Sequence, residues 1–98
     1  MLVSKMRRSK LEVYLDILKA VSETGKPTKI GNIANLSWNK TRKYLEFLEI
    51  NGFIRGSREG KRIEYKITEK GFEVLKILQK IKDALTPKAQ APKLQSKL

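Results

Sequence analysis

The sequence contains no cysteine and no histidine, and its ten acidic residues are outnumbered by 22 lysines and arginines. Without cysteine, disulfides and thiolate metal sites are excluded. Without histidine, the commonest metal ligand and the commonest general base are missing. Paired carboxylates remain a formal route to catalysis, but the acids alternate with cations at helical spacing, as they do in surface ion pairs. We therefore expect no enzyme, no metal site and no cofactor.

Long apolar runs are also absent. No stretch approaches the roughly eighteen apolar residues of a membrane span, and no hydrophobic region follows the basic start of the chain. We therefore expect neither a secretory signal nor a membrane partner. Ninety-eight residues suffice for one domain with a modest core. No motif indicates a small-molecule effector, and the expected location is the cytoplasm, in association with the nucleoid.

Positive charge is what the chain has in excess, with a net charge of +12 and a pI near 10.1. Such a surplus suits a polyanionic partner such as double-stranded DNA. Residues 11–51 hold six cations against five acids, whereas residues 52–67 hold five against two. Residues 1–10 carry four cations and residues 86–98 carry three, both without acids. The surplus therefore lies at the two ends and in segment 52–67.

The stretch 36–52, LSWNKTRKYLEFLEING, predicts a helix around which the chain is organised. Ser37 is a suitable N-cap, and Gly52 can end the helix in the left-handed conformation. At helical spacing, one apolar stripe is expected to face the core. Its members are Trp38, Thr41, Leu45 and Leu48, with Tyr44 at the border.

The opposite side of this helix has two unlike halves. Its first turns carry a basic and polar group consisting of Asn39, Lys40 and Lys43, with Arg42 on the flank. Phe47 and Ile50 occupy the same side near the C-terminal end, so we expect the second half to be buried in the domain. A helix that is rooted at one end and basic at the other fits a groove of nucleic acid. A solvated amphipathic helix would have the same pattern.

Two further helices are predicted before this one. The first begins at Ser9, which can form a capping box with Glu12, and ends at Gly25. Its core-facing residues are Leu11, Tyr14, Leu15, Ile17, Leu18 and Val21. The second is short, spans residues 28–35 and has Thr28 as its cap. Two such helices joined by a tight turn match the helix-turn-helix pattern.

Two strand-like runs, 53–55 and 61–67, flank a turn-forming loop at 56–60 that carries a cation. The second run alternates apolar and polar residues, as a half-buried strand does. A hairpin in this position is a wing. The order of elements predicts an α+β, mainly α fold: a winged helix-turn-helix with three helices and a two-stranded wing over residues 9–67.

Residues 68–85 predict a C-terminal helix capped by Thr68, which we expect to mediate dimerisation. Phe72 and Leu75 are expected to pack back on the wing and on the first helix. A second stripe has the four-three-four spacing of a coiled-coil seam and is the candidate dimer interface: Val74, Leu78, Ile81 and Leu85. The alternative is that both stripes pack inside one chain.

The two ends of the chain have no helical or strand periodicity. Residues 1–8 read as a flexible basic arm, which either lies along phosphates or a minor groove or is simply a frayed terminus. Residues 86–98, with two prolines and three lysines, read as a disordered basic tail.

The segments ANLSW and YLEFLEINGFI, followed after the wing by TEKGF, give the chain a family resemblance. Over residues 9–85 it resembles the small basic winged-helix proteins of archaea. These include the ten-kilodalton dimeric chromatin proteins and related predicted transcription regulators, some of them carried by archaeal viruses. The resemblance implies DNA binding without catalysis and a homodimer formed by the last helix as an antiparallel coiled coil. That helix is short here, which favours a compact, regulator-like dimer over an extended rod.

In a winged helix, the third helix enters the major groove. Its candidate contacts are Ser37, Trp38, Asn39, Lys40, Arg42 and Lys43. Asn39 can pair with adenine, Arg42 or Lys43 can reach the acceptors of guanine, and Lys40 is better placed to contact a phosphate. Trp38 fits the core better, with its ring edge on a sugar or phosphate.

The wing and the second helix are the candidate contacts to phosphates or the minor groove: Arg55, Arg58, Lys61 and Arg62 from the wing, and Lys29 and Asn32 from the second helix. A plain solvated surface explains the last two equally well. Three functions fit these residues. The first is a dimeric sequence-specific transcription regulator, the second is a non-specific chromatin or architectural protein, and the third is a winged helix used to bind protein or RNA.

Overall fold

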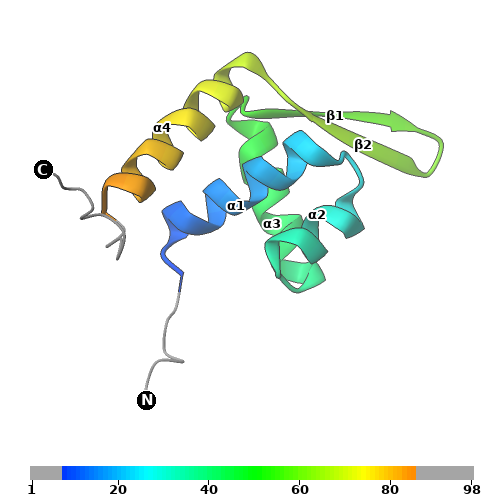
Figure 1. The fold of residues 1–98 in the computed structure, drawn as a ribbon. Helices are drawn as coiled ribbons and strands as arrows, with labels where there is room; N and C mark the ends of the chain where they lie inside the picture. The colour runs from blue at the N-terminus through cyan, green and yellow to red at the C-terminus, as the bar shows by residue number, and fades with distance from the viewer. Residues whose placement is uncertain (1–7, 86–98) are drawn as a thin grey trace, which may run out of the picture.

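The computed structural model describes residues 8–85, which form four helices and one hairpin (Figure 1). The elements are α1 (Lys10–Glu23), α2 (Pro27–Ala34), α3 (Trp38–Ile50), β1 (Ile54–Glu59), β2 (Arg62–Ile67) and α4 (Glu69–Leu85). The predicted order and the winged-helix arrangement are confirmed. The expected tail at 86–98 and all but the last residue of the expected arm lie outside the described residues.

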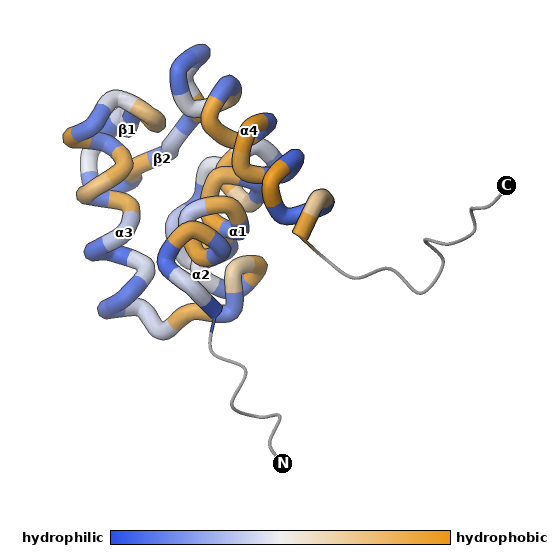
Figure 2. The backbone as a smooth tube through the Cα atoms, turned by 90° about the vertical axis from the view of Figure 1, so that its left-hand side faces the viewer, coloured by the Kyte–Doolittle hydropathy of each residue, from blue (hydrophilic) through white to orange (hydrophobic). Residues whose placement is uncertain are grey.

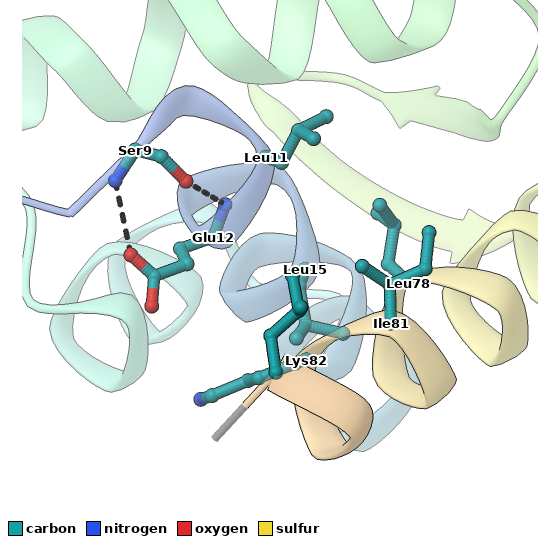
Figure 3. A pocket seen from close by; sticks show the side chains of 8 residues that line it. Ser9, Leu11, Glu12, Leu15, Leu78, Ile81 and Lys82 are labelled. Atoms are coloured by element: carbon teal, nitrogen blue, oxygen red, sulfur yellow. Dashed lines mark hydrogen bonds between the residues drawn. The ribbon is translucent and has the colours of Figure 1, made fainter. Parts of the chain in front are cut away.

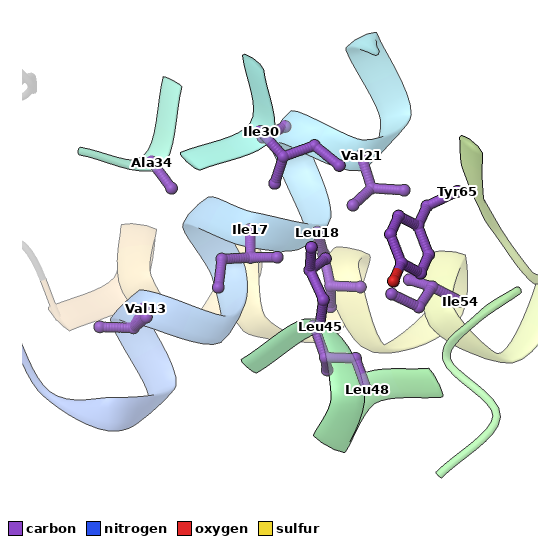
Figure 4. Packing of buried hydrophobic residues seen from close by; sticks show 11 residues of the cluster. Val13, Ile17, Leu18, Val21, Ile30, Ala34, Leu45, Leu48, Ile54 and Tyr65 are labelled. Carbon is purple, nitrogen blue, oxygen red and sulfur yellow. The ribbon is translucent and has the colours of Figure 1, made fainter. Parts of the chain in front are cut away.

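Helix α1 is the centre of the core and packs against α2, α3, α4 and β2. Ile17 and Leu18 are fully buried on its inner side (Figure 4). The facing residues come from the other elements: Ile30 and Ala34 from α2, Leu45 and Leu48 from α3, and Ile54 and Tyr65 from the wing. The predicted stripe of α1 is therefore confirmed except at Leu11. That side chain is 56% exposed, because it lies in the first turn and faces an open groove beside α4.

The start of α1 is tied to the end of α2. The predicted capping box is present, with Ser9 Oγ accepting from Glu12 N and Glu12 Oε1 accepting from Ser9 N. Arg8, which the sequence placed in the flexible arm, pairs with Asp16 at 2.9 Å. Its guanidinium also donates to the carbonyl oxygens of Ala34, at 2.6 Å, and Asn35, at 3.0 Å. Arg8 therefore belongs to the folded domain.

Helix α2 begins one residue earlier than predicted, and Thr28 does not cap it. Lys26 is the N-cap residue without a side-chain bond, and Pro27 occupies the first turn. The fixed φ of proline suits that position, and its missing N–H needs no acceptor there. The helix ends at Ala34, and its C-cap residue Asn35 adopts the left-handed conformation at φ 58°. This residue makes the tight turn into α3.

Helices α2 and α3 approach closely at Gly31. A Cβ atom at this position would lie 2.6 Å from Thr41 Oγ1. Thr41 is fully buried, and its hydroxyl donates to the Ser37 carbonyl oxygen at 2.8 Å. The glycine that weakens α2 as an isolated helix is what permits the crossing of the two helices.

The wing is longer than predicted. Residues 56–59, expected in a loop, continue β1, which pairs with β2 in antiparallel register from Ile54↔Ile67 to Glu59↔Arg62. Only Gly60 and Lys61 form the turn, and Gly60 has a φ of +59°. A two-residue turn with positive φ matches the twist of a hairpin, which is why the strands extend to it. The hairpin projects from the helices in Figure 1.

The segment TEKGF locks α4 onto the end of α3. Thr68 Oγ1 donates to the Gly52 carbonyl oxygen and accepts from Gly71 N, which confirms Thr68 as the cap. Lys70 Nζ donates to the Asn51 carbonyl oxygen at 3.0 Å and lies 4.9 Å from the centre of the Phe53 ring. Gly52 has a φ of +80°, the left-handed conformation expected at the end of α3.

Helix α4 runs beside α1 (Figure 2). Its apolar residues pack differently from the prediction. Leu75 packs on the core, as predicted, whereas Phe72 is 48% exposed. Val74 and Leu78 of the expected dimer seam also pack on the core cluster. Within residues 8–85, none of the helices combines the length and the apolar character needed to cross a membrane.

Candidate nucleic-acid interface

The first two turns of α3 present a basic surface to solvent. The helix is anchored by Thr41, Leu45 and Leu48, all at most 2% exposed, while the outward residues are exposed: Asn39, Lys40, Arg42 and Lys43. Ser37 Oγ accepts from Lys40 N at 3.3 Å and is therefore occupied as the N-cap. In Figure 2, α3 is mostly hydrophilic at its end nearest α2. None of the three cations forms an ion pair within residues 8–85.

Trp38 does not fill the core. Its side chain is 53% exposed and lines a groove of about 280 Å³ between α3 and the wing. Pro27 and Tyr65 contribute to the same groove. The expectation that Trp38 is a core residue was wrong, because the first turn of α3 extends past the helices that cover its remainder. The indole instead forms part of the surface beside Arg42.

The four wing cations are not brought to one side. Arg58 shares a face of the hairpin with Tyr65, toward α3, and pairs with Glu49 of that helix at 3.7 Å. Arg55 and Arg62 point to the opposite face by the alternation of the strands. Lys61 is in the turn. All four are exposed.

Glu49 connects α3 to the wing, a role that the sequence did not reveal. Its carboxylate accepts from Gly56 N at 3.2 Å and lies beside the Arg58 guanidinium. The backbone approaches these side chains closely at Gly56, since a Cβ there would lie 3.0 Å from Tyr65 Cε1 and 3.1 Å from Glu49 Oε2. Glu49 therefore sets the position of the wing against α3. One of two glutamates in the second half of a helix gives no local signal of such a contact.

The pKa of Tyr65 depends on the contact between α3 and the wing. Burial raises the pKa of its phenol above the ordinary value of 10.0, and the negative charges of Glu49 and Glu46 raise it further, while Arg58 opposes them. A phenol whose pKa is raised by folding stabilises the fold fully below pH 10.0, and this contribution is lost as the pH rises through the folded-state pKa.

We therefore expect the free energy of unfolding to fall between about pH 9 and pH 11 more steeply in the native chain than in Tyr65→Phe. Urea unfolding at a series of pH values measures both curves. Lysine titration is common to the two proteins, so their difference isolates the phenol. Parallel curves would show that Tyr65 ionises as easily in the folded as in the unfolded chain.

The second half of α3 is more open than predicted. Phe47 is 44% exposed and Ile50 79% exposed, although both were expected in the core. Phe47 stacks on Tyr14 of α1, with ring centroids 5.3 Å apart. Helix α1 covers only one flank of α3, so apolar residues on the outward side remain in contact with solvent. On α2, Lys29 and Asn32 are both exposed.

A second exposed surface lies at the far end of α4. A groove of about 370 Å³ separates the end of α4 from the start of α1 (Figure 3). Ile81 and Leu85, at 45% and 78% exposure, line it together with Leu11. Ile77, which the predicted seam omitted, is 55% exposed. Three of the four residues of the predicted seam, Leu78, Ile81 and Leu85, therefore line the groove, and Ile77 extends the open apolar surface beyond them.

Similar proteins agree with this architecture. A family model of winged helix-turn-helix proteins matches residues 7–86. Uncharacterized protein MJ0287 of Methanocaldococcus jannaschii is 32% identical over 85 residues, which cover 86% of this chain and 84% of that protein.

Two solved structures are similar as well. Sso10a-2, a DNA-binding protein from Sulfolobus solfataricus, is 26% identical with a TM-score of 0.74, covering 79% of this chain and 81% of its own. The transcriptional regulator BldR from Sulfolobus solfataricus is 24% identical with a TM-score of 0.65, covering 93% and 70%, and shows the shared fold. With its helix-turn-helix, wing and matching family model, the chain belongs to the winged helix-turn-helix family.

Proposed function

We propose that this protein is a transcription regulator that binds specific sequences of double-stranded DNA as a homodimer. The observation that carries the proposal is the surface of α3, where Lys40, Arg42 and Lys43 are exposed and form no ion pairs within the described residues. Cations left without acidic partners retain their full attraction for phosphates and base acceptors. The buried Thr41 and Leu45 fix the helix that carries them.

In this mode, the first two turns of α3 enter the major groove. Asn39 pairs with an adenine, and Arg42 or Lys43 with a guanine. Trp38, half-exposed beside Arg42, contacts the sugar–phosphate backbone. On the wing, Arg58 contacts phosphates, exchanging the weak 3.7 Å contact with Glu49 for a stronger one.

The wing cations Arg55, Lys61 and Arg62, and Lys29 and Asn32 of α2, complete the proposed contacts to the backbone or minor groove. Because the wing cations occupy both faces of the hairpin, the hairpin is expected to enter a groove with one face toward each strand. The DNA-binding neighbour Sso10a-2 supports a DNA partner, and BldR supports a regulatory role.

The homodimer is proposed to form through α4 and the first turn of α1. The stripe of Ile77, Ile81 and Leu85, with Leu11 across the groove, leaves four large apolar side chains between 45% and 78% exposed. Fully burying each such side chain contributes about 1.5–3 kcal/mol, which opposes an association cost of about 4–15 kcal/mol. Two chains together bury eight such side chains, and because these are already partly buried, their combined contribution falls within the range of that cost. Val74 and Leu78 also pack on the core of the subunit, and Leu78 lines the groove as well.

Selection of duplexes from a random pool separates the proposed function from non-specific architectural binding. The full chain should enrich a recurring sequence motif. Asn39→Ala and Arg42→Ala should each weaken binding to that motif by about 1–3 kcal/mol while leaving affinity for random duplexes nearly unchanged. Lys80→Ala removes an exposed cation of α4 and serves as the control. Binding without enrichment would favour the architectural function, and no duplex binding at low salt would favour a protein or RNA partner.

A further inference from the structure

A separate groove lies on the other side of α3 from the wing, against the start of α1. It has a volume of about 310 Å³, near the lower end of the ~300–1,000 Å³ typical of ligand sites. Three lysines and three aromatic residues line it: Lys10, Tyr14, Lys40, Lys43, Tyr44 and Phe47. We refer to this as the aromatic groove. No carboxylate is part of its lining.

The three rings of the aromatic groove hold one another in place. Tyr14 lies in the middle, with its ring centroid 5.4 Å from Tyr44 in an edge-on arrangement and 5.3 Å from Phe47 in a stacked one. Phe47 nevertheless remains 44% exposed. A ring that is fixed by its neighbours and open to solvent offers a flat apolar surface, and little conformational entropy is lost when a partner stacks on it.

The charges around these rings favour an anionic partner. Lys10, Lys40 and Lys43 form no ion pairs within the part of the chain that the structure describes. A DNA duplex would satisfy the lysines but not the rings, because its bases are already stacked on one another. Unpaired nucleotides supply both a phosphate and an open base face, and proteins bind them with this combination of cations and aromatic rings.

The aromatic groove also continues along α3. Lys40 and Tyr44 line a neighbouring groove of about 460 Å³, together with Val13, Leu36 and Arg8. The Arg8 charge is paired with Asp16, so the lysines carry the attraction. Because Lys40 and Tyr44 line both grooves, the two adjoin at these residues and together form one path along α3. We propose that this path binds single-stranded nucleic acid, with bases stacked on Phe47 and Tyr44 and phosphates beside Lys10 and Lys43.

The test uses the full chain and a fluorescently labelled short oligodeoxythymidine, with binding measured by anisotropy. Phe47→Ala should weaken binding about tenfold, within the range for loss of one stacked base. Phe47→Trp, which keeps an aromatic ring, should bind at least as tightly as the native chain. Phe47→Leu keeps an apolar contact with Tyr14 and should fold. It should nevertheless bind the oligonucleotide as weakly as Phe47→Ala does.

Phe72→Ala is the matched control. Phe72 is 48% exposed and has Lys76 Nζ 5.2 Å from its ring centre, but it lies on α4, outside the groove. Its removal should leave single-strand binding unchanged. The proposal would be overturned if Phe72→Ala lost as much single-strand affinity as Phe47→Ala, or if Phe47→Ala kept the native affinity. It would also be overturned if Phe47→Trp bound as weakly as Phe47→Leu, or if the native chain bound no single strand.

Measuring duplex affinity on the same variants distinguishes this proposal from the proposed regulatory function. Phe47 lies beyond the first two turns of α3, so its variants should bind duplex as the native chain does. A parallel loss of duplex and single-strand affinity would make the groove an extension of the duplex site and overturn the inference. Single-strand binding that depends on Phe47, without any duplex binding, would sustain the inference while the proposed regulatory function fails.

Discussion

Gly71→Ala is expected to lower the free energy of unfolding by about 3 kcal/mol or more, although alanine is the better helix former. In an exposed helix the same change would add about 1 kcal/mol of stability. Here the new Cβ would overlap the carbonyl oxygen of Phe53 and approach Ile67 Cγ1 to 2.9 Å. That carbonyl accepts from Thr68 N at 3.1 Å and cannot turn away without losing the bond. Crowding against the backbone therefore outweighs the gain in helix propensity.

Urea unfolding followed by circular dichroism measures this change, with Gly60→Ala as the control. Gly60 also has special geometry, a φ of +59°, but a Cβ there meets no atom within 4 Å. Gly60→Ala should therefore lower the free energy of unfolding only by the cost of placing alanine in the left-handed conformation, about 1–2 kcal/mol. Native stability in Gly71→Ala would show that α4 is not seated against Phe53 as described.

Ile81→Glu is expected to convert the proposed dimer to a monomer and to weaken binding to a paired DNA site by about a hundredfold or more. Ile81 is 45% exposed on the open stripe of α4, so a charge there is tolerated in the isolated subunit. In a dimer the carboxylate would be buried against the partner without a counter-charge. Losing the second half-site removes the gain from binding two linked sites at once.

Lys80→Glu is a strict control for Ile81→Glu. Lys80 is exposed and lies next to Ile81 in the sequence, about 100° around the helix from it. The change to glutamate removes more positive charge than Ile81→Glu does. Lys80 borders Ile77 but does not line the groove formed by Ile81, Leu85 and Leu11. Sedimentation equilibrium should show a monomer only for Ile81→Glu, and the DNA affinity of Lys80→Glu should fall by a small factor. Equal oligomeric states for the native chain and Ile81→Glu would exclude this interface.

Order and boundaries of the elements were largely predictable because their signals are local. The capping box at Ser9 and the caps at Ser37 and Thr68 use side chains within three residues of the N–H groups they satisfy. Gly52 ends α3 through its own backbone conformation. The loop expected at 56–60 was wrong because Gly and Ser resemble a turn, whereas here Gly56 makes room for Tyr65 inside a strand.

Exposure was less predictable because it depends on which neighbours cover a helix. Both Trp38 and Phe47 were expected in the core because they are large and apolar. In the structure, the helices around α3 are too short or too far to one side to cover them. On α4, the spacing of Val74 and Leu78 fits a dimer seam and a core stripe equally well. Only the position of α1 shows that both pack on the core, that Leu78 also lines the open groove, and that Ile77 stays exposed.

Contacts between distant parts of the chain had no sequence signal at all. Arg8 reaches the carbonyl oxygens at the end of α2, 26 and 27 residues away. Glu49 reaches the wing, and Tyr14 of α1 joins the rings of α3. Each contact requires the fold before the partners become neighbours. The cations of α3 were found from the sequence because helical periodicity alone places them on one side.

In the proposed function, the exposed cations of α3 and the wing bind the phosphates and bases of duplex DNA as a twofold pair. Its most direct test is the salt dependence of the equilibrium constant for binding a duplex that carries the selected motif. If each subunit neutralises about three or four phosphates, log K should fall against log salt with a slope of about −5 to −7. A slope near zero would contradict the claim.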